Sequence, residues 1–148
     1  MEYTKKPERK PEQRKVSIVL DTNFLLIPGQ FKVDIFRELE RIMDAPYTLQ
    51  VLDATVDELK ELAGKKGAKG RDKDAAKLAL KLVQAKTETQ NINMVTSAEP
   101  YVDQAILTMA KEDKKLVVAT QDQELKRLLK KAGTKIITLR QKKYLIMR

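Results

Sequence analysis

The residues of this 148-residue chain best suited to chemistry are four carboxylates that follow predicted strands. Asp21 comes directly after the apolar run 16–20, and Asp122 comes three residues after another such run. Glu58 and Asp103 lie early in the helices predicted after two further strands. Because the carboxyl ends of parallel strands meet at one edge of a sheet, we expect these four side chains at that edge.

Four carboxylates at one edge predict a bound cation. Two carboxylates about 4 Å apart repel by about 4 kcal/mol at an effective dielectric of 20, so a cluster needs a cation, a raised pKa or wide spacing. Oxygen ligands alone favour Mg²⁺ or Mn²⁺. Such an ion binds a phosphodiester and lowers the pKa of an attacking water, which predicts metal-dependent hydrolysis with Mg²⁺ or Mn²⁺ as cofactor.

Each acid also has a purely structural interpretation. Asp21 serves equally well as the N-cap of the turn that follows it. Glu58 completes a capping box with Thr55, and Gln123 completes another with Thr120. Carboxylates in the first turn of a helix are also favoured by the helix dipole. Taken singly, the four acids therefore do not demand catalysis.

The elements that must position these acids alternate between strand and helix. Strands are expected at 16–20, 47–52, 92–95, 116–119 and 136–139, with a short edge strand at 143–147. A helical turn at 24–27 is expected to end at Pro28-Gly29. Helices are expected at 34–43, after a cap at Asp53 or Thr55, at 73–86, from Pro100 and at 120–131. This order predicts an α/β fold, a mostly parallel sheet of about five strands covered by helices on both faces.

The charge of the chain indicates a polyanionic partner. Thirty Lys and Arg residues against 21 Asp and Glu give a net charge of +9, and the basic residues concentrate in 1–15, 60–86 and 126–148. Nucleic acid is the simplest partner, because no basic stretch carries the bulky aromatic face of a membrane-binding segment. The alternative is a Lys-rich solvated surface. Residues 1–15 read as a flexible basic arm, and residues 16–148 as a single domain.

A Gly-rich stretch carries three lysines, Lys65, Lys66 and Lys69, that are expected to contact nucleic-acid phosphates. A solvated loop is the alternative interpretation of the same stretch. Lys-to-phosphate contacts supply the sequence-independent part of nucleic-acid affinity.

What the chain lacks narrows the function further. Without Cys or His, it holds no zinc ribbon, thiol nucleophile or imidazole base. No apolar run of membrane-spanning length and no charged-then-apolar leader is present, which predicts a cytoplasmic protein. Asn23 stands where a haloacid dehalogenase-type phosphatase needs its second Asp, and no Gly-rich first turn supports a dinucleotide.

Four motifs in order resemble those of the PIN-domain nucleases. They are Val-Leu-Asp-Thr-Asn-Phe at 19–24, Val-Asp-Glu-Leu at 56–59, Tyr-Val-Asp-Gln-Ala-Ile at 101–106 and Val-Ala-Thr-Gln-Asp-Gln-Glu-Leu at 118–125. The resemblance implies a three-layer α/β/α sandwich and Mg²⁺- or Mn²⁺-dependent cleavage of RNA. It also implies that Asp21, Glu58, Asp103 and Asp122 are catalytic metal ligands. Asn23 and Thr120 would position them by hydrogen bonds.

The branch of the family is suggested by residues 119–130 and 136–144, which resemble the archaeal PIN proteins of small-subunit rRNA processing. This likeness implies rRNA as substrate, a role in ribosome biogenesis, ribosome-assembly factors as partners and a possible homodimer. Gln121 departs from the pattern, because the family often has Asn there. Two alternatives stay open: a ribonuclease toxin held by an antitoxin, and a non-catalytic RNA-binding scaffold.

Overall fold

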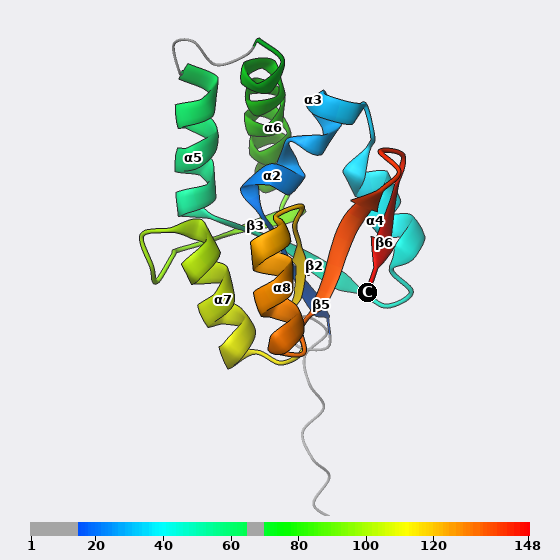
Figure 1. Ribbon diagram of the computed structural model, residues 1–148. Helices are drawn as coiled ribbons and strands as arrows, with labels where there is room; N and C mark the ends of the chain where they lie inside the picture. Colours follow the sequence, from blue (N-terminus) through cyan, green and yellow to red (C-terminus); the bar gives the residue numbers. More distant parts are fainter. Residues whose placement is uncertain (1–14, 65–69) are drawn as a thin grey trace, which may run out of the picture.

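A computed structural model of the protein describes residues 15–64 and 70–148 (Figure 1). Its strands form one six-stranded sheet. The strand order is β3-β2-β1-β4-β5-β6. The first five strands along the chain pair in parallel, and β6 pairs with β5 in antiparallel fashion. The strands are β1 (Val16–Leu20), β2 (Tyr47–Leu52), β3 (Ile92–Val95), β4 (Val117–Ala119), β5 (Lys135–Arg140) and β6 (Tyr144–Met147). The predicted α/β class is confirmed, with the expected edge strand as the sixth.

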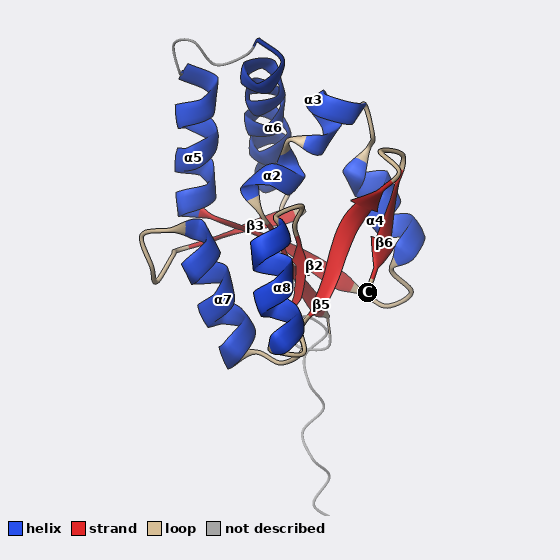
Figure 2. Cartoon of the chain, in the orientation of Figure 1, coloured by secondary structure: helices blue, strands red, loops and turns tan. Residues whose placement is uncertain are grey.

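The helices cover both faces of the sheet (Figure 2). They are α2 (Thr22–Leu25), α3 (Ile27–Phe31), α4 (Ile35–Ile42), α5 (Asp53–Gly64), α6 (Gly70–Glu88), α7 (Val102–Glu112) and α8 (Gln123–Lys131). Side chains of β1 alternate between two cores: Ile18 and Leu20 pack with α2 to α6, while Val19 packs with α7 and α8. The period of two along a strand produces this division, and the three-layer sandwich is confirmed.

The strand order reverses at β1, which is the feature that positions the site. From β1 the chain builds outward through β2 and β3, and then returns to place β4 on the other side of β1. The ends of β1 and β4 therefore lie side by side, and the Asp21 N–H donates to the Ala119 carbonyl at 2.9 Å. Open α/β sheets bind their ligands at such a switch point, beyond the carboxyl ends of the strands.

Two proline-based boundaries predicted from the sequence are wrong. Pro28 and Gly29 lie inside α3, because a proline in the first helical turn has no N–H that needs a partner. A Cβ on Gly29 would lie 2.5 Å from the Cα of Ala75, so the glycine lets α3 approach α6 closely. Pro100 does not open α7, which starts at Val102 with Tyr101 as its N-cap.

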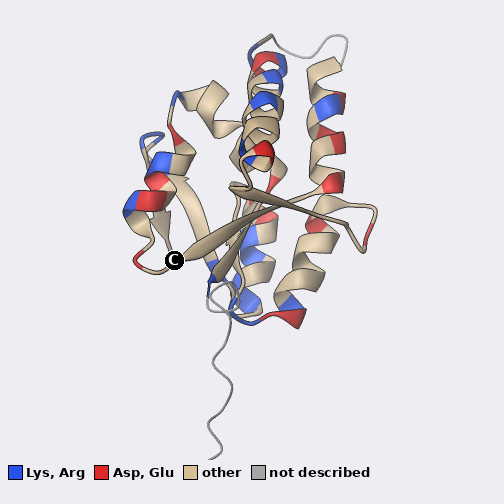
Figure 3. Cartoon of the chain, turned by 180° about the vertical axis from the view of Figure 1, so that it is seen from behind, with Lys and Arg blue, Asp and Glu red and all other residues tan. Residues whose placement is uncertain are grey.

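Charged residues lie mainly on helices and loops, and the strands are largely uncharged (Figure 3). Among the described residues, no helix is both long enough and apolar enough to cross a membrane. Two predictions concern segments outside the described residues. They are the basic arm, apart from Lys15, and the phosphate contacts of Lys65, Lys66 and Lys69. The division into arm and domain stays a prediction.

Candidate active site

Asp21 is the most deeply placed acid of the site, with 6% of its surface exposed. One carboxylate oxygen accepts from the Thr22 N–H at 2.8 Å, and the other accepts from the Thr120 hydroxyl at 2.7 Å. Burial raises the pKa of Asp21, and the negative charges of Glu58 and Asp122 raise it further, while the two hydrogen bonds act in the opposite direction. A buried carboxylate thus sits in a negative environment.

Thr120, fully buried at the end of β4, joins the parts of the site. Its hydroxyl lies 2.7 Å from Asp21 Oδ2, 3.1 Å from the Asp122 backbone nitrogen and 3.4 Å from Asn23 Oδ1. Asn23 Oδ1 also accepts from the Gln121 N–H at 2.8 Å. These bonds tie the loop that carries Asp122 to the end of β1.

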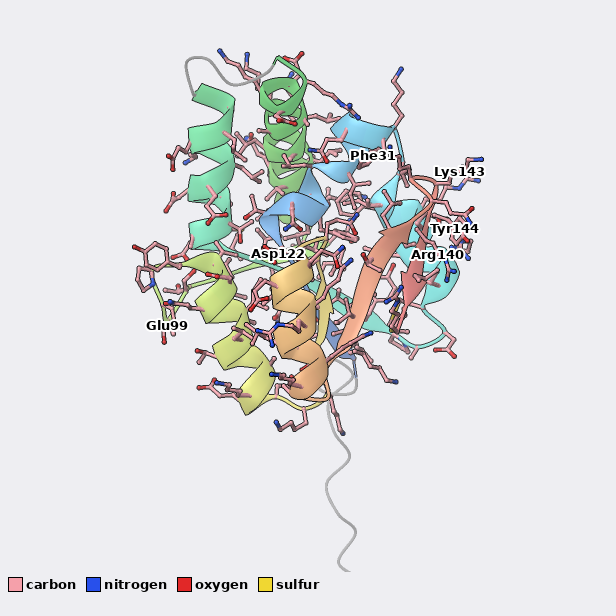
Figure 4. The ribbon with its side chains drawn as sticks, in the orientation of Figure 1. Phe31, Glu99, Asp122, Arg140, Lys143 and Tyr144 are labelled. Atoms are coloured by element: carbon pink, nitrogen blue, oxygen red, sulfur yellow. The ribbon has the colours of Figure 1, made fainter. Side chains whose placement is uncertain are left out.

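Asp122 is the N-cap of α8, where its carboxylate accepts from the Leu125 N–H at 2.8 Å (Figure 4). The capping box predicted between Thr120 and Gln123 is therefore wrong. The Thr120 hydroxyl is engaged with Asp21, and the helix begins two residues later than that motif requires. A carboxylate at a helix N-terminus is favoured by the dipole, and this one also lies within electrostatic reach of Asp21.

Glu58 reaches the site from α5. Its carboxylate accepts from the Thr22 hydroxyl at 2.6 Å, and Thr22 is the residue whose N–H contacts Asp21. The predicted capping box of Thr55 with Glu58 is wrong, because Thr55 lies inside α5 and is fully buried. Within the described part of the chain, the Thr55 hydroxyl has no hydrogen-bond partner. Glu58 is consequently oriented by α2 and not by its own helix.

Asp103 differs from the other predicted ligands in its contacts. It lies in the first turn of α7 with its side chain exposed, and it accepts from the N–H of its neighbour Gln104 at 2.9 Å. It is not among the charges that raise the pKa of Asp21. The structure therefore brings together Asp21, Glu58 and Asp122 and leaves Asp103 at the rim.

The donor set suits a hydrated divalent cation. Glu58 and Asp122 raise the pKa of Asp21. Residues 15–64 and 70–148 contribute no salt bridge to any of these three acids. The same residues contain no group of three or more acids close enough to enclose an ion. Mg²⁺ commonly keeps several waters and takes one or two carboxylates, so these residues fit that ion better than a metal held by protein ligands alone.

Two contributors, Thr22 and Gln121, were not identified from the sequence as site residues. Thr22 links Asp21 and Glu58 through its N–H and its hydroxyl. The side-chain amide oxygen Oε1 of Gln121 accepts from the Thr138 hydroxyl at 2.6 Å and from the Leu139 N–H at 2.8 Å, which anchors the Asp122 loop to β5. The available signals were the middle position of Asp-Thr-Asn and the departure of Gln121 from the usual Asn.

Comparison with known proteins decides the family. A family model described as "PIN like domain" matches residues 18–142. The chain belongs to the PIN-like domain family. It is 35% identical over 127 residues to Ribonuclease VapC4 of Methanocaldococcus jannaschii, and the match covers 86% of this chain and 92% of that protein. The PIN resemblance predicted from the four motifs is confirmed.

Solved structures agree on the fold of this PIN-like domain. The PIN domain endonuclease Utp24 superposes with a TM-score of 0.71 at 22% identity, over 89% of this chain and 90% of the other. A domain of a functionally unknown protein from Methanocaldococcus jannaschii superposes with a TM-score of 0.57 at 21% identity, over 84% and 91%. At these identities the likeness supports the fold and nothing finer.

Proposed function

We propose that this PIN-like domain is a Mg²⁺- or Mn²⁺-dependent endoribonuclease whose centre is the edge formed by Asp21, Glu58 and Asp122. The observation that carries the proposal is Asp21, a carboxylate buried at the switch point and kept beside two other negative charges. Such an arrangement has no evident value for stability, because burial and like charge both disfavour the ionised form. A cation that neutralises this edge gives the arrangement a use.

The chain's own residues have separate roles in this proposal. Asp21 and Asp122 would hold the cation, Glu58 and Asp103 would contact its water shell, and Thr120 and Asn23 would position the acids. When bound, the ion supplies positive charge to the phosphate and lowers the pKa of a water. Thr120 fixes one oxygen of Asp21 through its hydroxyl, which leaves the orientation of that carboxylate little freedom.

RNA is the proposed substrate class. The chain carries a net charge of +9, and a relative with 35% identity is named as a ribonuclease. Cleavage of rRNA in ribosome biogenesis, with assembly factors or a second copy of the chain as partners, rests on the sequence resemblance and stays a proposal. A cytoplasmic location and phosphate contacts by Lys65, Lys66 and Lys69 also stay predictions.

The test is cleavage of end-labelled rRNA fragments and tRNA with Mg²⁺, Mn²⁺ or EDTA, with Asp21→Asn as the inactive variant. We expect internal cuts that require the metal and disappear in the variant. Equal cutting in EDTA, or by the variant, would contradict the proposal. The positions of the cuts distinguish rRNA processing from the activity of a toxin, and for the toxin a small antitoxin gene should lie beside this one.

The non-catalytic scaffold is the competing function. The basic segments 60–86 and 126–148 suit RNA binding without turnover. Tight binding with no cutting of any of the RNAs, in either metal, would favour it. Salt dependence does not separate the two functions, because phosphate contacts make both sensitive to ionic strength.

A further inference from the structure

A hollow of about 260 Å³ lies between α8, β5 and the end of β6. Its lining includes four cationic side chains and no acidic one. The cations are Lys126, Arg127, Lys130 and Arg148, and the rest of the lining is Gln123, Thr138 and the apolar Ile136. We call this hollow the α8 groove.

Three cations of the α8 groove are available to an anion. Arg127 is paired with Glu124 on the same helix. Among the described residues, Lys126, Lys130 and Arg148 form no salt bridge. The position of Arg148 is fixed by two backbone hydrogen bonds with Ile136 of β5, at 2.8 and 3.0 Å. The groove thus collects positive charge that the described chain does not neutralise.

The cations of the groove are close enough to oppose one another. The pKa of Lys126 is lowered by its burial and then by the positive charges of Arg148 and Lys130, while Asp122 acts in the opposite direction. Crowded cations favour a bound anion, for the same reason that clustered carboxylates favour a metal. Because the charge of Asp122 also acts on Lys126, the groove lies within electrostatic reach of the acidic edge.

The α8 groove begins where the candidate active site ends. Asp122, Lys126 and Lys130 occur at intervals of four residues, which places them along one face of α8. Four residues correspond to about 6 Å of rise, so Lys126 lies about one turn from Asp122, the acid that caps the helix. An extended ligand that lies at the acidic edge and follows this face of α8 would contact Lys126 and then Lys130.

We propose that the α8 groove binds a backbone phosphate of the RNA strand, adjacent to the phosphodiester presented to Asp21 and Asp122. The proposal rests on the proposed function for its substrate. Nucleic acid is the proposed occupant because the groove continues along α8 from Asp122, where the proposed function places an RNA phosphodiester, and successive phosphates of one strand can lie at both places. The groove therefore sets the position of the RNA and not the chemistry of cleavage.

The experiment measures binding of a fluorescein-labelled single-stranded oligoribonucleotide in EDTA at several salt concentrations, so that cleavage plays no part. The test variant is Lys126→Gln/Lys130→Gln. Its matched control is Lys111→Gln/Lys115→Gln, which removes two exposed lysines at the same spacing, one at the end of α7 and one in the loop after it, outside the basic segments 60–86 and 126–148. We expect the test variant to bind about tenfold more weakly, with a smaller salt slope by about 0.7 for each lost phosphate contact. The control should bind like the unaltered chain.

Lys126→Arg/Lys130→Arg guards against a loss of fold and should bind like the unaltered chain. Equal affinity of the test variant and its control would overturn the proposal that the groove binds phosphate, even when the unaltered chain cleaves RNA. Absence of salt-dependent binding by the unaltered chain would overturn it too. Polyglutamate that binds as tightly, with the same dependence on the two lysines, would assign the groove to a protein partner. Weaker binding by the test variant alone supports the groove, whether or not cleavage is found.

Discussion

Asp21 and Asp103 follow strands of the same sheet, but the protein holds them in different ways. Asp21 is buried, and both of its oxygens accept hydrogen bonds, one of them from a residue 99 positions away along the chain. Asp103 is exposed and is bonded to the next residue of its own helix. The first is fixed by tertiary structure and the second by local geometry. We infer that Asp21 sets the geometry of the site, whereas Asp103 affects only the strength of metal binding.

The largest expected effect is that of Asp21→Asn on catalysis. The substitution keeps the shape of the side chain and removes its charge, so metal-dependent cleavage should fall by about 10²- to 10³-fold. Asp103→Ala is the comparison at the same edge. Retention of cleavage by Asp21→Asn would contradict the inference that Asp21 matters more to the site than Asp103.

Asp21→Asn should also change how stability depends on pH. The pKa of Asp21 in the folded chain is raised above its ordinary value of 3.8, so the folded state binds a proton more readily than the unfolded state. The stabilisation present below that value is lost as pH rises through the raised pKa. In EDTA, the variant should therefore have the higher Tm at neutral pH, and the difference should shrink in acid. Thermal melts at a series of pH values measure this, and a lower Tm at neutral pH would contradict it.

Thr120→Val should have the next largest effect. Valine preserves the volume but leaves a buried oxygen of Asp21 without its donor, at a cost of about 1 to 3 kcal/mol in the free energy of unfolding. Cleavage should fall by about 10- to 100-fold, as for other residues that orient metal ligands. Thr108→Val on α7 is the matched control. Denaturant melts and initial cleavage rates provide both values, and an unchanged rate would show that Asp21 needs no partner.

Asp103→Asn should have a smaller effect, seen as a shift in the Mg²⁺ concentration needed for half-maximal cleavage. Because the side chain is exposed and bonded locally, the free energy of unfolding should not change. We expect a shift of about tenfold or less, in line with a contact through the water shell. A loss as large as that of Asp21→Asn would identify Asp103 as a direct ligand.

Asp53→Asn should leave cleavage unchanged. Asp53 is a further acid that follows a strand, but its carboxylate accepts from the Ser97 N–H and hydroxyl and holds the loop after β3. The hydrogen bonds from Ser97 lower the pKa of Asp53, so any stability that it contributes is present above pH 3.8 and is lost in acid. Cleavage rates and acid melts check this, and loss of cleavage would extend the site to the start of α5.

The fold followed from local patterns to a large extent. Strands at 16–20, 47–52 and 92–95 have the predicted bounds, because short runs of apolar and β-branched residues between polar or turn residues favour strands. The boundaries at Pro28 and Pro100 were wrong, because proline is compatible both with a first helical turn and with the segment before one. Only packing against neighbouring elements decides between these positions.

The sequence by itself determined the alternation of strands and helices, the PIN-like motifs and the acids that follow the strands. Tertiary structure decided what each polar group contacts. Thr120 bonds Asp21 instead of capping α8, and Glu58 bonds Thr22 instead of Thr55. A hydroxyl or carboxylate has several partners within reach along the chain, and its choice depends on which distant residues the sheet order brings beside it. The position of β1 between β2 and β4 made that choice here, and no local pattern encodes it.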